Sequence, residues 1–192
     1  MEGSARPKPL RVDAQRNRVR VLEAAAAVFA EQGLSASVRD VAARAGVGLG
    51  TVARHFPTKE LLLDAIVLRA VQEEVDHGNA LAAEYEPGRA FFTFLSYLVD
   101  RGNANRGLAD ALTGAGFDVE KAASRADLDV IQVLQRLLDG AQATGDVRPD
   151  VDAADVKALV VGCLARERRA PDPAARTRML AVLRRGLHVA GP

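Results

Sequence analysis

Residues 45–56 read AGVGLGTVARHF and place glycines at the alternate positions 46, 48 and 50. The pattern Gly48-x-Gly50-x-x-Ala53 formally matches the glycine fingerprint that holds a dinucleotide pyrophosphate. That loop must follow a β-strand inside a strand-helix-strand unit. The residues before Gly46 instead repeat apolar side chains at helical spacing, and no β-branched run of strand length lies nearby. We therefore expect no cofactor here.

The same stretch is explained better by two short helices joined by a tight turn. Ser37 and Asp40 have the spacing of a capping box and predict the start of the first helix. Gly46 can supply the positive φ at which a helix ends. Gly48 and Gly50 lack a Cβ, so the second helix can approach another surface closely. A helix-turn-helix places its second helix in the major groove of DNA.

The rest of the chain repeats apolar residues at helical spacing, which predicts an all-α fold. Asp13 can cap a helix that runs to about Gln32 and is followed by Gly33. Thr58, after Pro57, can cap a long amphipathic helix from Lys59 to about Asn79. Weaker breaks are expected at several glycines and prolines beyond it, including Gly102, Gly107 and Gly140.

Composition limits the class of protein. The chain has 192 residues, 48% of them hydrophobic and 27% charged, as in ordinary globular proteins. Its one cysteine, Cys163, excludes an internal disulfide and fits a reducing compartment, so the cytoplasm is expected. The longest apolar run, residues 24–30, is too short to span a bilayer, and no membrane association is expected.

Charge is distributed unevenly between the two parts of the chain. Residues 1–60 carry a net charge of +4, whereas residues 61–192 carry −3. A basic N-terminal part favours an anionic partner such as nucleic acid.

Residues 38–64, VRDVAARAGVGLGTVARHFPTKELLLD, resemble the tetracycline-repressor (TetR) family of bacterial transcriptional regulators. The helix expected before them also looks like the first helix of that family. The resemblance implies a three-helix helix-turn-helix domain over residues 13–58, preceded by a flexible basic arm over residues 1–12. It further implies a helical domain over residues 59–192 that dimerises and usually binds a small effector.

The resemblance also assigns the residues that contact DNA. Thr51, His55 and Lys59 are expected at phosphates, while Leu49, Gly50 and Arg54 would face or flank the groove. The whole expected set is Ser37, Arg39, Gly48, Leu49, Gly50, Thr51, Arg54, His55 and Lys59. The chemistry fits, because a threonine hydroxyl and a lysine bind phosphate and an arginine binds phosphate or guanine. The alternatives are that the cations are merely solvated and that His55 packs in the core.

One position departs from the family pattern. Ala53 stands where the family commonly has a tyrosine, so a phenol that would touch DNA is missing. The affinity or the operator preference could differ as a result.

Two other classes of function are alternatives to a DNA-binding regulator. An enzyme is not expected, because Glu74 and His77 form only half of a di-metal motif and Cys163 lies on an apolar stripe. No metal site is expected either. An all-helical protein-interaction module is the second alternative. Its binding to a short duplex would lack the steep salt dependence of a protein that neutralises phosphates.

The expected mechanism is a homodimer that binds an inverted-repeat operator on double-stranded DNA and is released, as a repressor, by a small apolar or amphipathic effector. The last two helices, about 152–168 and 172–189, would form the dimer interface or would only close the core of one chain. The expected interface residues are Val156, Leu159, Val160, Cys163, Leu180, Leu183 and Leu187. The expected effector pocket contains Phe91, Phe94, Tyr97, Leu98, Leu112, Phe117, Ile131 and Leu134. The basic residues Arg6, Lys8 and Arg11 could add contacts to DNA.

Overall fold

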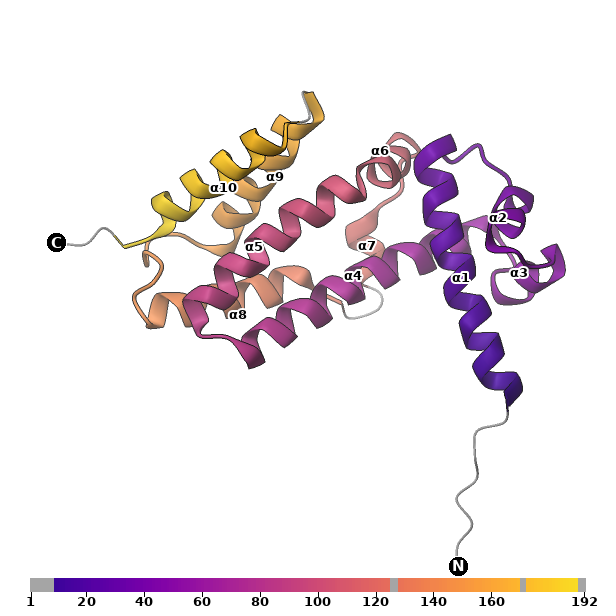
Figure 1. Ribbon diagram of the computed structural model, residues 1–192, viewed down its shortest axis with the longest axis horizontal. Helices are drawn as coiled ribbons and strands as arrows, with labels where there is room; N and C mark the ends of the chain where they lie inside the picture. The colour runs from indigo at the N-terminus through magenta and orange to yellow at the C-terminus, as the bar shows by residue number, and fades with distance from the viewer. Residues whose placement is uncertain (1–8, 125–127, 170–171, 190–192) are drawn as a thin grey trace, which may run out of the picture. The chain divides into compact units, whose positions relative to one another are not determined.

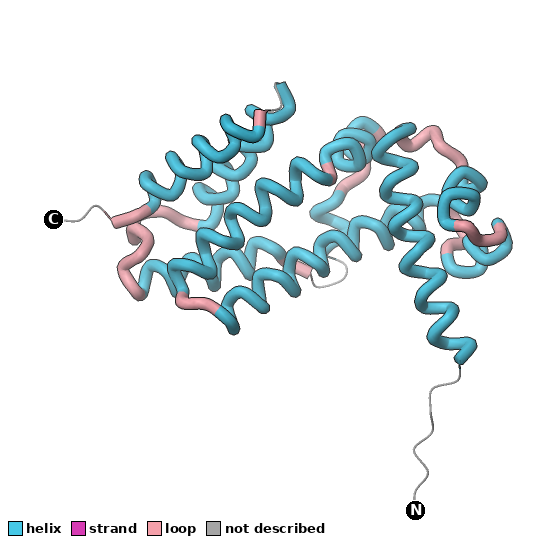
Figure 2. The backbone as a smooth tube through the Cα atoms, in the orientation of Figure 1, coloured by secondary structure: helices cyan, strands magenta, loops and turns pink. Residues whose placement is uncertain are grey.

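The computed structural model describes residues 9–124, 128–169 and 172–189, and every regular element in these ranges is an α-helix (Figures 1 and 2). The all-α prediction is therefore confirmed. The helices are α1 (Pro9–Gln32), α2 (Val38–Ala45), α3 (Leu49–His55), α4 (Lys59–Glu84), α5 (Pro87–Ala104), α6 (Arg106–Gly114), α7 (Val119–Ser124), α8 (Val130–Ala143), α9 (Ala153–Arg169) and α10 (Pro173–Leu187). None of these helices is long and apolar enough to cross a membrane.

The chain divides into two compact units. The first contains the residues up to Arg69 together with Arg106–Ala122. The second contains Ala70–Asn105 together with the residues from Ala123 onward. The first unit is therefore larger than the expected DNA-binding segment 13–58, because it also holds the start of α4 and all of α6.

The core of the first unit forms around α1, which packs against α2, α3 and α6. Val21, Ala25 and Phe29 of α1 are completely buried. Val41 of α2 and Val52 of α3 are completely buried as well, and Ala42 and Ala45 of α2 are buried beside Val41. The opposite face of each short helix is therefore not needed for packing inside the unit.

The start of α1 differs from the expectation. The helix begins at Pro9 and not at Asp13, so residues 9–12 are helical and the predicted arm over residues 1–12 is too long. Proline is favoured in the first turn of a helix because it has no N–H to leave unsatisfied and its φ is already helical. Arg6 and Lys8 lie outside the described residues.

The second unit is organised around α5, which lies between α8 and the pair α9 and α10 (Figure 1). Phe91 and Phe94 of α5 and Leu138 of α8 are completely buried in its core. Gly78 of α4 allows a close approach in this unit. A Cβ at Gly78 would lie 2.4 Å from Cγ1 of Val133 and 3.0 Å from Cε2 of Phe94, which is closer than van der Waals contact.

The predicted breaks at three glycines are wrong. α5 continues through Gly102, α6 through Gly107 and α8 through Gly140. The long helix α4 also extends beyond Asn79, to Glu84. A glycine inside a helix costs only about 1 kcal/mol, and tertiary packing of the apolar face outweighs that cost.

Candidate DNA interface

The turn between α2 and α3 has the geometry that the sequence predicts. The Ser37 hydroxyl accepts a hydrogen bond from the Asp40 N–H at 3.3 Å, and the Asp40 carboxylate accepts one from the Ser37 N–H at 2.8 Å. This is a complete capping box at the start of α2. Gly46 ends the helix in the left-handed region with φ of +65°. The corner is therefore fixed by local interactions at both ends of α2.

The inner and outer faces of α3 differ in exposure. Val52 and the following Phe56 are buried, whereas Leu49 is 43% exposed. Gly48, Gly50 and Arg54 are exposed too, and Thr51 and His55 are half-buried. A Cβ added at Gly48 or Gly50 would meet no atom within 4 Å, so neither glycine is required by packing inside the chain. The outer face of α3 is thus open to another molecule.

Two arginines on this surface have free guanidinium groups. Arg39 on α2 and Arg54 on α3 are exposed, and within the described residues no hydrogen bond, ion pair or ring contact engages them. Arg44, by contrast, forms a two-pronged pair with Glu31 at 2.7 and 2.9 Å. Arg39 and Arg54 can therefore bind phosphate or a base edge without breaking an internal contact.

Lys59 is placed differently from the expectation. Its ammonium donates to the carbonyl oxygen of Ala36 at 2.8 Å and also to that of Leu34, and it lies 5.2 Å from the centroid of the Phe29 ring. These contacts join the first turn of α4 to the loop between α1 and α2. Two of its three donors are used inside the chain, so its expected phosphate contact has at most one donor left.

Two carboxylates of this unit, those of Asp40 and Glu60, are held at helix starts. Hydrogen bonds from the side chain and the backbone of Ser37 lower the pKa of Asp40 below its usual 3.8. The pKa of Glu60 in the first turn of α4 is lowered by its own backbone N–H and by the Thr58 side chain. α3 has no acid in its first turn, and its N-cap Gly48 provides no side-chain hydrogen bond. No acid in the first turn therefore neutralises the positive end of the helix that faces outward.

Sequence reasoning missed two arginines that shape this surface. The guanidinium of Arg18 lies 5.4 Å from the centroid of the Phe56 ring, at the end of α3. That of Arg20 donates to the carbonyl of Ala45 at 2.7 Å, at the end of α2. The alternation of arginines at positions 16, 18 and 20 was the available signal. Their partners lie too far away in sequence for any local pattern to identify them.

The expected effector residues are divided between the two units. Phe91, Phe94 and Leu134 are buried in the core of the second unit, where Tyr97 and Leu98 pack against them. Ile131 is exposed at the start of α8. Leu112 and Phe117 belong to the segment that packs with the first unit.

The stripe expected at the dimer interface faces inward for the most part. Val156, Val160 and Cys163 of α9 and Leu187 of α10 are buried in the core of their own unit, and Leu180 and Leu183 pack against that core. Leu159 alone of the expected set is exposed. The apolar stripe on these two helices therefore packs mainly in the core of the same chain.

The groups considered for catalysis have other surroundings. Cys163 is buried, and burial together with the nearby Glu167 raises the pKa of its thiol, which opposes formation of the thiolate. The His77 ring stacks on Tyr97 with centroids 4.0 Å apart. No group of three or more potential metal ligands occurs in the part of the chain that the structure describes.

Comparisons with known proteins agree with this geometry. Residues 21–66 match the family described as bacterial regulatory proteins, tetR family. Residues 86–189, more than half of the chain, match the family described as transcriptional regulator SbtR-like, C-terminal domain. The chain belongs to the TetR family. It is therefore a helix-turn-helix, DNA-binding transcriptional regulator, and the protein-interaction module is set aside.

Solved structures support the TetR assignment over nearly the whole chain. A TetR transcription regulatory protein from Mycobacterium vanbaalenii is 44% identical, with a TM-score of 0.77 over 94% of this chain and 100% of that one. The TetR regulator SCO0520 from Streptomyces coelicolor is 33% identical, with a TM-score of 0.73 over 91% and 99%. The HTH-type transcriptional regulator UidR of Escherichia coli (strain K12) is 26% identical over 163 residues, 79% of this chain and 80% of UidR.

Proposed function

We propose that this TetR-family regulator is a repressor that binds an inverted-repeat operator as a homodimer and leaves it when a small effector binds. The observation that carries the proposal is the outer face of α3, where Gly48, Leu49 and Gly50 are exposed and Arg54 is unengaged. A helix whose Cβ-free positions face outward can approach the base edges closely, and its flanking arginine can bind phosphate or guanine.

The expected DNA contacts divide into two groups by their surroundings. Arg39, Arg54 and the half-buried Thr51 and His55 remain proposed contacts, because their polar groups are available on the outer surface. The main role of Ser37 is to cap α2, because its N–H and hydroxyl both donate hydrogen bonds to the Asp40 carboxylate. Lys59 is treated as a residue that holds the loop before α2 and only secondarily as a phosphate contact.

A dimer interface is proposed on the exposed sides of the last two helices. On α9 the exposed residues Ala158, Val161, Gly162 and Ala165 are spaced so that they form one face, and Val161 is 54% exposed. On α10 Val182 is 66% exposed and Gly186 follows one turn later. A Cβ at Gly162 or Gly186 would meet no atom within 4 Å. A small, apolar face of this kind lets a second helix pair approach closely, and a twofold axis would pair it with itself.

The dimer can be tested with one substitution and a matched control. Val161→Glu places a charge on the proposed face, so sedimentation should show a shift from twice the chain mass of 20.4 kDa toward the monomer. Thr93→Glu adds the same charge at an exposed position on α5 and should leave the dimer intact. A Val161→Glu protein that dimerises as tightly as the wild type would exclude this face.

The effector is proposed to bind in the second unit, beside half-buried polar groups of α4 and α5. Burial raises the pKa of Glu74 and of the Tyr97 phenol, and Tyr97 stacks on His77 and Phe94. Titratable groups in such surroundings are found more often at binding sites than on ordinary surfaces. Release from DNA would need a coupling free energy of about 1–3 kcal/mol between effector and operator.

The proposed function is tested by selecting bound sequences from fragmented host DNA. An inverted repeat with half-sites about one helical turn apart, near 34 Å, is expected. Genes beside the selected sites then supply candidate effectors, which should weaken operator binding in a titration. Selection of unrelated sequences without twofold symmetry would overturn the operator, and unchanged affinity across all candidates would overturn the release.

A further inference from the structure

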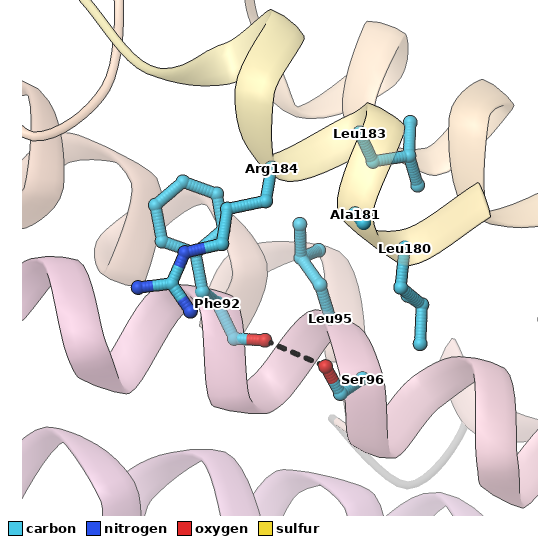
Figure 3. A pocket seen from close by; sticks show the side chains of 7 residues that line it. All are labelled: Phe92, Leu95, Ser96, Leu180, Ala181, Leu183 and Arg184. Atoms are coloured by element: carbon cyan, nitrogen blue, oxygen red, sulfur yellow. Dashed lines mark hydrogen bonds between the residues drawn. The ribbon is translucent and has the colours of Figure 1, made fainter. Parts of the chain in front are cut away.

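A groove lies between α5 and α10 in the second unit, outside the polar groups discussed above. Its volume is about 200 Å³ (Figure 3). Phe92, Leu95 and Ser96 of α5 line one wall, and Leu180, Ala181, Leu183 and Arg184 of α10 line the other. An apolar cavity on the order of 150 Å³ holds a molecule the size of benzene, so this groove has room for one ring or a short branched chain.

The polar groups of the groove differ in what they can offer a ligand. The Ser96 hydroxyl donates to the Phe92 carbonyl at 3.1 Å, so its proton is already used (Figure 3). Arg184 is the charged residue among the seven that line the groove. Its guanidinium lies 5.0 Å from the centroid of the Phe92 ring, and this contact holds it over the apolar wall.

Arg184 differs from Arg176 and Arg178, the two arginines nearer the start of α10, in having no carboxylate partner. Arg176 pairs with Asp100 at 2.9 Å, and Arg178 pairs with Asp172 at 3.3 Å. No carboxylate in the described ranges pairs with Arg184. The imidazole of His188 lies on the same Phe92 ring, with centroids 4.8 Å apart, so the neighbouring side chain is not acidic either. This end of the groove therefore favours an anion.

We infer that the groove is a binding site for a small organic carboxylate with an aromatic or branched apolar body. The apolar body would lie against Phe92, Leu95 and Leu180, and the carboxylate would accept hydrogen bonds from the planar Arg184 guanidinium. The proposed dimer face leaves the groove open, because Val182 and Arg184 are two residues apart and point to different sides of α10. The inference goes beyond the proposed function and does not depend on it.

Phenylacetate and two analogues of the same shape test the inference on the full-length protein. Ligand-observed NMR and calorimetric titration should show that phenylacetate binds about tenfold or more tightly than neutral phenylacetamide, because a hydrogen bond between two charged groups is stronger than one to a neutral amide. Cationic phenethylamine should bind more weakly than either. Equal affinity for the acid and the amide would overturn the inference.

Substitutions in and beside the groove test whether phenylacetate binds there. Arg184→Gln should lose the preference for the acid over the amide, whereas Arg185→Gln, which alters the next arginine, also exposed but absent from the lining of the groove, should keep it. Ala181→Phe should fill the groove and abolish binding of both compounds. Binding that survives Ala181→Phe in a folded protein, judged by circular dichroism, would place the ligand elsewhere and overturn the site. Operator affinity is measured separately, so failure here would leave the proposed repressor function untouched.

Discussion

The outer face of α3 carries the cation Arg54, and the start of α4 carries the cation Lys59. The two differ in whether their donors are already bonded inside the chain. Arg54 on the outer face is exposed, and within the described residues its guanidinium has no partner. Lys59, five positions later, bonds to two backbone carbonyls across the loop between α1 and α2. The comparison shows that charge and position in a motif do not define a role. Whether the donors are already used decides if a cation holds the fold or remains available to DNA.

Lys59→Met should have the largest effect, a loss of stability. If stability did not change, the distinction between Lys59 and Arg54 would be wrong. Removing the ammonium leaves two carbonyls without their donor, so the free energy of unfolding should fall by about 2–4 kcal/mol. Chemical denaturation measures this, with Arg54→Gln as the control whose stability stays within about 0.5 kcal/mol of wild type. Unchanged stability with a weaker, less salt-dependent DNA affinity would show that Lys59 acts mainly on phosphate.

Arg54→Gln tests the other side of the comparison. The stability should not change, but operator affinity should fall about tenfold, and the slope of log affinity against log salt should decrease by about one if the contact is a phosphate. Fluorescence anisotropy over a salt series on the selected operator and on a base-substituted copy measures both quantities. Full retention of affinity on both duplexes would remove Arg54 from the interface.

Substitutions at two glycines distinguish an effect on stability from an effect on DNA binding. Gly46→Ala forces an alanine into φ of +65°, with its Cβ 3.0 Å from the Arg20 guanidinium, so stability should fall by about 1 kcal/mol or more. Gly50→Ala lies inside α3 with open space around it and should raise stability by about 0.5–1 kcal/mol. The added methyl should nevertheless weaken DNA binding if α3 approaches the bases closely. Undiminished operator affinity in Gly50→Ala would argue against that approach.

The smallest effect concerns the capping box and depends on pH. The pKa of Asp40 is lowered by its hydrogen bonds to Ser37, so its ionised form favours the folded state. That contribution is complete above the unfolded pKa and is lost as the pH falls through the lowered folded value. The stability difference between wild type and Asp40→Asn should therefore be constant above about pH 5 and disappear in stronger acid. A difference that persists unchanged in acid would show that it does not come from ionisation of Asp40.

Local chemistry made the DNA-binding segment predictable from the sequence. The capping box, the Gly46 stop and the Thr58 cap each join residues no more than four positions apart along the chain, and all three are found in the structure. The contacts of Lys59 and Arg20 were not predictable, because their partners lie 23 to 25 residues away.

The sequence could not decide which molecule covers an apolar stripe. Val156, Val160 and Cys163 have the periodicity of either an interface or a core, and only the packing of α9 against α5 and α8 assigns them to the core. The exposed face with Ala158 and Gly162 carries small residues and produces little apolar signal of its own. Aromatic residues such as Phe91 and Phe94 are equally typical of a pocket lining and of a core, and here both are completely buried in the core.

The close contact at Gly78 restricts how this protein can evolve. Val133 and Phe94, the two side chains that a new Cβ would strike, are themselves buried and cannot turn aside into solvent. A lineage could replace this glycine only after a compensating loss of volume, for example Val133→Ala, had occurred first. Positions 78 and 133 should therefore change together or not at all, and the order of the two changes should matter.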